Sequence, residues 1–161
     1  MIVGEAIRPL IALVVFLGLT LAVSLVGGAV TATSVGTWYQ DLAKPVFNPP
    51  DWLFAPVWST LFLLMAVAGW RVWRLGGVKV RSKELAAFAF QLALNLGWSV
   101  VFFGFRAPAW AFMEIVALFA AIVWTTWVFW RCDRWAGVLM LPYAVWVAFA
   151  LVLNGAIWHL N

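Results

Sequence analysis

Residues 7–35 read IRPLIALVVFLGLTLAVSLVGGAVTATSV, and this stretch decides the fold class. Its apolar run from Leu10 to Val26 contains no charged residue. A bilayer core about 30 Å thick is crossed by an α-helix of roughly 20 mostly apolar residues. The continuous run also lacks the alternation of a membrane β-strand, which extends over roughly 10 residues. The stretch therefore predicts a transmembrane helix.

A secretory signal peptide is the alternative interpretation of this stretch. Arg8 precedes the apolar run, and the segment from Val30 to Ala32 is compatible with a cleavage site. The apolar core of a signal peptide is usually about 7–15 residues long, and the run from Leu10 to Val26 exceeds that length. We therefore favour a retained helix.

The composition extends this prediction to the whole chain. The protein has 161 residues, of which 66% are hydrophobic and 10% charged, whereas soluble proteins have roughly 25% charged residues. The sequence predicts an all-α integral membrane protein, a single domain (1–161) formed by a bundle of five transmembrane helices. Ser82, followed by Glu84, is predicted to cap the third helix, and Pro108 to open the fourth. The helices are expected at about 7–35, 51–75, 82–105, 108–131 and 135–158.

The distribution of basic residues predicts the orientation. Most Lys and Arg residues lie on the side of the membrane that holds the N-terminus, and the other side carries only Lys44 and Arg106. By the positive-inside rule the N-terminus is cytoplasmic if the host is a plasma membrane. We expect a bacterial cell membrane, inner or outer, and an organelle outer membrane stays open. Because the charges lie between apolar spans, the expected partner is the lipid bilayer and not nucleic acid. The N-terminus and the loops after the second and fourth helices carry Arg8, Arg71, Arg74, Lys79, Arg81, Lys83, Arg131 and Arg134.

The first loop, residues 37–52, reads TWYQDLAKPVFNPPDW and is the least apolar part of the chain. Its prolines lack a backbone donor and bias the preceding residues toward extended conformations. We expect an ordered connection that is neither helix nor strand. Its notable residues are Trp38, Tyr39, Lys44, Pro45, Phe47, Pro49, Pro50 and Trp52.

Two stripes of small residues predict close helix packing. On the third helix the stripe is a candidate homodimer face, and packing within the monomer is the alternative. The opposite side of the same helix is polar and aromatic, with Gln91, Asn95, Trp98 and Phe102. The small stripes are Ala89, Ala93 and Gly97 on the third helix, and Ser24, Gly28, Ala32 and Gly36 on the first.

Polar groups inside the bilayer cost several kcal/mol each when unpaired, so they face the bundle interior. Glu114 is the only carboxylate well inside a span. It is either protonated or paired with Arg106 at depth, or it lies at the interface, and both interpretations stay open. Aromatic residues that share a helix face with Asn or Glu indicate a pocket for a flat, partly polar ligand. Such faces are Trp110 and Glu114, and Tyr143, Trp146, Ala150 and Asn154. A further aromatic stripe, on the second helix, is Trp58, Phe62 and Met65.

Six other tryptophans fit the aromatic belts of the two membrane interfaces. One cysteine, Cys132, and one histidine, His159, predict neither an intrachain disulfide nor a metal site. No catalytic residues are predicted, because no Ser/His/Asp or Cys/His arrangement is evident. The expected belt residues are Trp70, Trp73, Trp127, Trp130, Trp135 and Trp158.

Four motifs together resemble the translocator protein family, also called tryptophan-rich sensory proteins or peripheral-type benzodiazepine receptors. They are WYxxLxKPxFxPPxW (38–52), PVW (56–58), QLALNLGWSVVFFG (91–104) and LPYAVWVAFALVLN (141–154). The resemblance implies a five-helix bundle, usually dimeric, that binds porphyrins and other tetrapyrroles. Some members of the family also bind cholesterol and benzodiazepine-site drugs.

The resemblance also implies a pocket, with the first loop as its lid. No cofactor is expected, and a porphyrin or haem-type tetrapyrrole is the expected ligand. Cholesterol recognition is doubtful, because Gly155 and His159 stand where animal members have Tyr and Arg. The lid residues are Tyr39, Lys44, Pro45, Phe47, Pro49 and Pro50. Together with Tyr143 from the aromatic faces, the pocket residues are Trp38, Trp58, Asn95, Trp98, Trp110, Glu114, Trp146 and Ala150.

The function indicated by these features is a membrane receptor or sensor for tetrapyrroles. A transporter of tetrapyrroles or lipids is one alternative, although five spans without an inverted repeat do not match an alternating-access design. The second alternative is light- and oxygen-dependent porphyrin breakdown, linked to the family, in which Trp58 is an oxidisable residue. We favour a protein that is not an enzyme.

Overall fold

The computed structural model describes residues 2–161, with side chains from residue 7 onward, and this part of the chain is helical and contains no strand. Five of its helices are long and apolar enough to cross a membrane. This confirms the predicted all-α bundle of five membrane-spanning helices. The long helices are α1 (Ile2–Ala32), α3 (Phe54–Arg74), α5 (Ser82–Ser99), α6 (Pro108–Cys132) and α7 (Arg134–Leu160).

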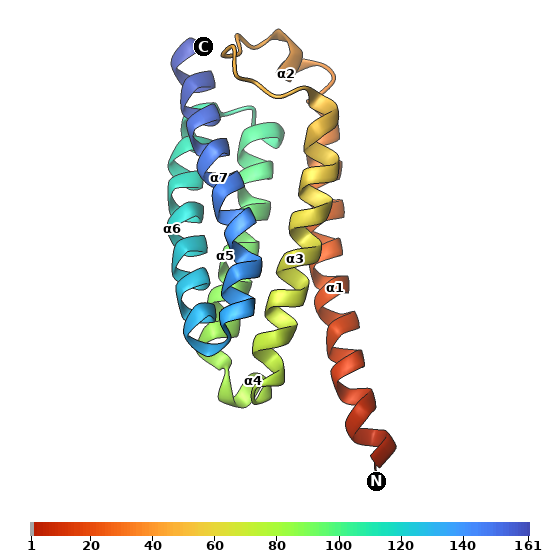
Figure 1. Cartoon of the computed structure of the whole chain (residues 1–161). Helices are drawn as coiled ribbons and strands as arrows, with labels where there is room; N and C mark the ends of the chain where they lie inside the picture. Colours follow the sequence, from red (N-terminus) through yellow and green to blue (C-terminus); the bar gives the residue numbers. More distant parts are fainter. Residues whose placement is uncertain (1) are drawn as a thin grey trace.

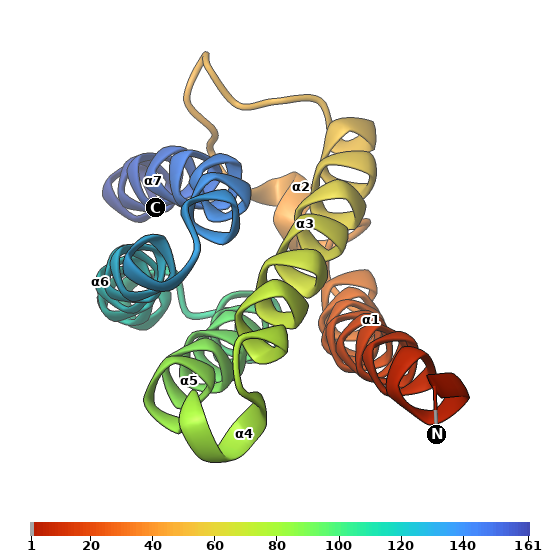
Figure 2. The same cartoon turned by 60° about the horizontal axis from the view of Figure 1, so that its bottom comes forward.

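The helices form a ring in the order α1, α3, α7, α6, α5, with α5 returning to α1 (Figure 2). The start of α1 and the short helix α4 (Gly77–Val80) lie at one end of the bundle, with the turn between α6 and α7 (Figure 1). The first loop and the C-terminus lie at the other end. We call the end with α4 the basic end, after its Lys and Arg residues, and the end with the first loop the loop end.

The first loop differs from its prediction in one respect. Residues Trp38–Asp41 form one helical turn, α2, and Asp51–Leu53 form a 3₁₀ turn, η1, that leads into α3. The prolines begin only at Pro45 and therefore do not restrain Trp38–Asp41. The expectation that no part of this segment is helical was wrong.

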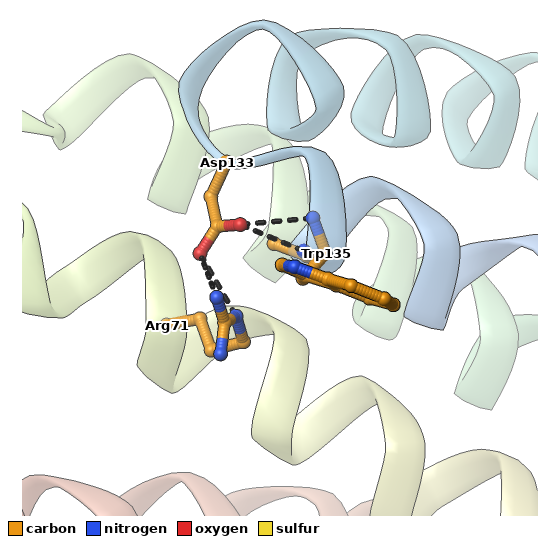
Figure 3. A network of polar contacts seen from close by, with 4 residues as sticks. Arg71, Asp133 and Trp135 are labelled. Carbon is orange, nitrogen blue, oxygen red and sulfur yellow. Dashed lines mark hydrogen bonds and ion pairs between the residues drawn. The ribbon is translucent and has the colours of Figure 1, made fainter.

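The ends of α5 and α7 correct a second expectation. Ser82 is the first residue of α5, whose cap position is Arg81, and no side chain bonds to the free amides there. A side-chain cap is found at the start of α7, where the Asp133 carboxylate accepts from the N–H groups of Trp135 (2.9 Å) and Ala136 (3.4 Å). Asp133 also pairs with Arg71 of α3 at 2.8 Å (Figure 3). One carboxylate therefore starts α7 and joins it to α3.

The C-terminal end of α5 widens into a π-helical turn, η2 (Val100–Gly104). The N–H of Phe105 donates to the carbonyl of Val100 at 2.9 Å, five residues back. Phe102 and Phe103 are both buried in this turn although they are adjacent in sequence. Such π-turns occur frequently at functional sites, and this one lies at the loop end.

The core is solid toward the basic end, where small residues of α3 allow close helix contact. A Cβ added at Gly69 would lie 2.8 Å from the ring of Phe16 on α1 and 3.2 Å from the ring of Phe88 on α5. The phenyl rings therefore fill the space beside this glycine. Other side chains with almost no exposure here are Met65, Ala68, Val72, Ile122, Phe129 and Met140.

Candidate functional site

A cavity of about 390 Å³ lies in the loop-end half of the bundle, among α1, α3, α5 and α7. Ligand sites usually have volumes of about 300–1,000 Å³ and mostly apolar walls with a few polar groups. This cavity fits that description. Its aromatic and polar lining residues are Ser24, Thr31, Tyr39, Asp51, Phe54, Trp58, Ser59, Phe62, Asn95, Trp98, Ser99, Phe102, Phe103, Trp146 and Asn154.

Three indole rings form much of the aromatic wall, one from each of α3, α5 and α7. Trp58 lies 5.7 Å from the ring of Phe62, and Trp98 stacks on Phe102 at 5.1 Å. Trp146 meets the ring of Phe54 edge-on at 5.9 Å. These aromatic neighbours fix the ring orientations, so the wall is preorganised.

Polar side chains on α5 and α7 hold the far side of the cavity together. The amide of Asn95 donates to the Tyr143 hydroxyl at 3.0 Å, and the indole N–H of Trp98 donates to Asn154 at 3.0 Å. Asn154 in turn donates to the carbonyl of Pro108 at 2.9 Å. The Nε1 atom of Trp146 is buried, and no acceptor for it is found among the described residues. Trp146 is therefore the lining residue with a free buried donor.

Tyr39 joins the first loop to the cavity wall. Its side chain is only 4% exposed and packs on the rings of Phe102 (6.2 Å) and Phe103 (5.6 Å). Burial raises its pKa to about 12. The hydroxyl therefore stays protonated at neutral pH and donates to Asn48 at 3.0 Å.

Polar contacts hold the first loop in place. The Gln40 amide donates to Asp51 at 2.8 Å, which joins α2 to the start of η1. The Asn161 side chain exchanges two hydrogen bonds of 3.0 Å with the backbone of Ala43, which joins the loop to the end of α7. Lys44 lies 4.7 Å over the Tyr39 ring. This loop is therefore an ordered cap on the loop end of the bundle (Figure 1).

One side of the cavity is open. On α1, Gly28 and Ala32 line the cavity and are exposed. On η1 and the start of α3, the exposed lining residues are Asp51, Ala55 and Ser59. A Cβ added at Gly28 would have no neighbour within 4 Å. The small stripe of α1 therefore borders empty space, although close helix packing was its predicted role.

The structure brings five of the predicted pocket residues together in the lining: Trp58, Asn95, Trp98, Trp146 and Ala150. Tyr143 stands one layer behind, in contact with Asn95 and Trp58. Trp38 packs edge-on against Phe102 at 5.8 Å and lies outside the lining.

Trp110 and Glu114 on α6 do not reach the cavity. Trp110 is 73% exposed and points away from the core. Both carboxylate oxygens of Glu114 are buried without a partner among the described residues, and one would lie 3.4 Å from a Cβ at Gly97. The expected partner Arg106 instead donates to Ser34 at 3.3 Å. The structure places α6 behind α5 and α7, which separates its side chains from the cavity.

The other predicted loop and dimer residues are placed as follows. Within the first loop, Phe47 packs edge-on against Phe149 of α7 at 6.4 Å, and only Tyr39 of the expected lid residues lines the cavity. Ala89 and Ala93 are exposed on the outer face of α5, whereas Gly97 contacts α6. The homodimer through this stripe stays a prediction.

Sequence reasoning missed the contribution of α1 and of the π-turn to the lining. Ser24, Gly27 and Thr31 line the cavity, but they carry no aromatic or charged group that marks them. Phe103 is adjacent to Phe102, and only the wider π-turn buries both. Asp51 appeared only as part of the first loop.

Comparison with known proteins gives the family. The model of the TspO/MBR family matches residues 16–159, from the middle of α1 to the end of α7. The chain belongs to the TspO/MBR family. This confirms the family predicted from the four motifs, and the five apolar helices with this membership show an integral membrane protein.

The family includes curated relatives from bacteria and animals. The chain is 41% identical to the tryptophan-rich protein TspO of Chlorobaculum tepidum, over 96% of this chain and 98% of the relative. It is 40% identical to the tryptophan-rich sensory protein of Cereibacter sphaeroides, over 77% of both chains. It is 36% identical to the human translocator protein, over 90% of this chain and 89% of the relative.

Proposed function

We propose that this protein is a membrane receptor or sensor that binds a porphyrin or another tetrapyrrole in the cavity under the first loop. The observation that carries the proposal is the cavity wall, in which Trp58, Trp98 and Trp146 present indole rings from three helices. A flat conjugated ligand stacks on such rings and gains about 0.5–1.5 kcal/mol per aromatic contact beyond burial of its area.

The polar groups of the wall suit the polar atoms of a tetrapyrrole. The free N–H of Trp146 would donate to a ring nitrogen or a carboxylate of the ligand. At the loop end Lys44 and Arg106 supply the positive charge that acidic substituents of a tetrapyrrole need. The lining residues include no His or Cys, so we expect recognition by stacking and shape, without a ligand to a central metal.

A titration of the purified protein with protoporphyrin IX, followed by tryptophan fluorescence, tests the proposal. We expect Trp58→Phe, Trp146→Phe and Asn95→Ala each to weaken binding about threefold to tenfold, through loss of stacking area or of a hydrogen bond. Trp110→Phe is the matched control, because Trp110 is exposed on the far side of α6. If these variants and the control all bind alike, the cavity is not the binding site.

The open side between α1 and the start of α3 favours transport as a second candidate, because it connects the cavity with the outside of the bundle. Purified protein in liposomes separates the two functions. A receptor binds the porphyrin without moving it into the lumen, whereas saturable uptake that Trp146→Phe slows would favour transport.

A further inference from the structure

A second hollow lies on the outer surface of the bundle, along the seam between α6 and α7. It has a volume of about 310 Å³ and faces away from the cavity described above. The Thr126 hydroxyl donates to the carbonyl of Ile122 at 2.8 Å, so it adds no unpaired polar group to the groove. The groove is lined by Val123, Thr126, Trp127, Trp130, Leu141 and Ala144.

Residue size explains the shape of this groove. Near the turn, a Cβ at Gly137 would lie 2.8 Å from Trp130, so this glycine lets α7 approach α6. Farther along α7, the small side chain of Ala144 leaves the hollow. Trp127 is also paired with Trp124 at 5.1 Å, which makes a broad aromatic edge.

Two arginines without an ion-pair partner among the described side chains lie where the groove approaches the basic end of the bundle. Arg131 follows Trp127 by one helical turn, and its guanidinium lies 5.0 Å from that ring. Arg134 opens α7 on the other side of the turn. Both are exposed, and neither forms an ion pair with the side chains described from residue 7 onward.

The acidic residue of the turn does not neutralise them. Asp133 pairs with Arg71 at 2.8 Å and accepts hydrogen bonds from the first amides of α7 (Figure 3). The basic end therefore offers uncompensated positive charge directly beside an apolar groove that faces the bilayer.

We propose that this groove is a binding site for an anionic phospholipid of the leaflet at the basic end. One acyl chain lies in the groove, and the phosphate is held by Arg131 and Arg134. From Trp130 to Val123 the groove follows α6 for about 10 Å, at about 1.5 Å per residue, and Arg131 comes directly after it in sequence. Guanidinium groups bind phosphate with two parallel hydrogen bonds, and stacking on Trp127 holds that of Arg131 in place.

Native mass spectrometry of the full chain in detergent tests the site. The probes are dioleoylphosphatidylglycerol, which is anionic, and dioleoylphosphatidylcholine, which is zwitterionic with the same acyl chains. We expect the wild type to retain the anionic lipid more tightly. Arg131→Gln should weaken anionic lipid binding about fivefold, the usual effect of one basic residue at a membrane surface. It should weaken the zwitterionic lipid less, because the choline group of that lipid offsets the charge of its phosphate. Ala144→Phe fills the groove and should weaken both.

Arg74→Gln is the matched control. Arg74 also lies over an indole at the basic end, 4.8 Å from Trp70, but Trp70 does not line this groove, whereas Trp127 under Arg131 does. We expect it to bind the anionic lipid like the wild type. Equal losses in Arg74→Gln and Arg131→Gln would show general surface charge only and overturn the site. Equal binding of the two lipids by the wild type would also overturn it. So would a change of oligomeric state in Ala144→Phe, because a second copy of the chain would then cover the groove.

Discussion

The two halves of the bundle are built from the same helices, yet one is solid and the other is hollow. Two glycines show the difference. Beside Gly69, toward the basic end, the rings of Phe16 and Phe88 occupy the space of an absent side chain. Beside Gly28, toward the loop end, nothing lies within 4 Å. Small residues therefore have opposite consequences, which depend on whether a neighbouring helix supplies a large side chain.

This contrast separates stability from binding. In the basic-end half, close packing and the Arg71–Asp133 pair hold the helices together. In the loop-end half, small residues of α1 keep the cavity open, and the first loop closes its end. Substitutions in the first half should change the free energy of unfolding, and those in the second should change ligand affinity.

The largest expected effect is that of Gly69→Leu. The new side chain would start 2.8 Å from the Phe16 ring, and overpacking of this kind costs about 1–3 kcal/mol or more. Thermal unfolding in detergent measures it, with Gly28→Leu as the matched control because its side chain enters empty space. Equal destabilisation by the two variants would remove the distinction between the halves.

Asn95→Ala comes next. Asn95 and Tyr143 stand where the two halves meet, and the variant leaves the Tyr143 hydroxyl buried without its partner. Such a loss costs about 1–3 kcal/mol. Because Tyr143→Phe removes the orphaned hydroxyl, the double variant should recover most of the stability. A double-mutant cycle with no coupling would show that the hydrogen bond is unimportant.

Asp133→Ala should cost less, about 1 kcal/mol, because it removes the cap of α7 and a partly exposed ion pair. Asp133→Asn keeps an oxygen for the cap and should retain most of that stability. Chemical unfolding measures both variants. Porphyrin affinity should not change in either, and a loss of affinity would contradict the separation of the two halves.

The smallest expected effect is that of removing the hydrogen bonds that hold the first loop in place. Asn161→Ala removes two exposed hydrogen bonds to Ala43, and a net loss of about 0.5 kcal/mol would raise the ligand off-rate about twofold. Stopped-flow fluorescence measures the rate, and Gln40→Ala should act similarly by releasing Asp51. Unchanged off-rates in both variants would leave the loop with a structural role only.

Much of the fold was predictable because hydrocarbon imposes a simple rule on sequence. Long apolar runs located the five helices to within a few residues, and the third helix was already expected to reach residue 105. The π-helical form of its last turn was not predictable, since this turn buries both Phe102 and Phe103 against Tyr39, which is distant in the sequence.

The site was predictable where one helix face carries its own signal. Asn95 and Trp98 share a face with Phe102, and all three line the cavity. Trp110 shares a face with Glu114, but the ring order places that face outside the cavity. Nor does sequence show that Asn161 meets Ala43, because 118 residues separate them. Periodicity gives the faces of single helices, and only their arrangement decides which faces meet.

The most direct test of the cavity is a protoporphyrin IX titration of Gly28→Leu beside Gly18→Leu. Both glycines lie on α1 with no atom within 4 Å of an added Cβ, but only Gly28 lines the cavity. We predict that Gly28→Leu weakens binding at least about tenfold, since it fills the space of the ligand, and that Gly18→Leu binds like the wild type. Equal affinities of the two variants would contradict the account.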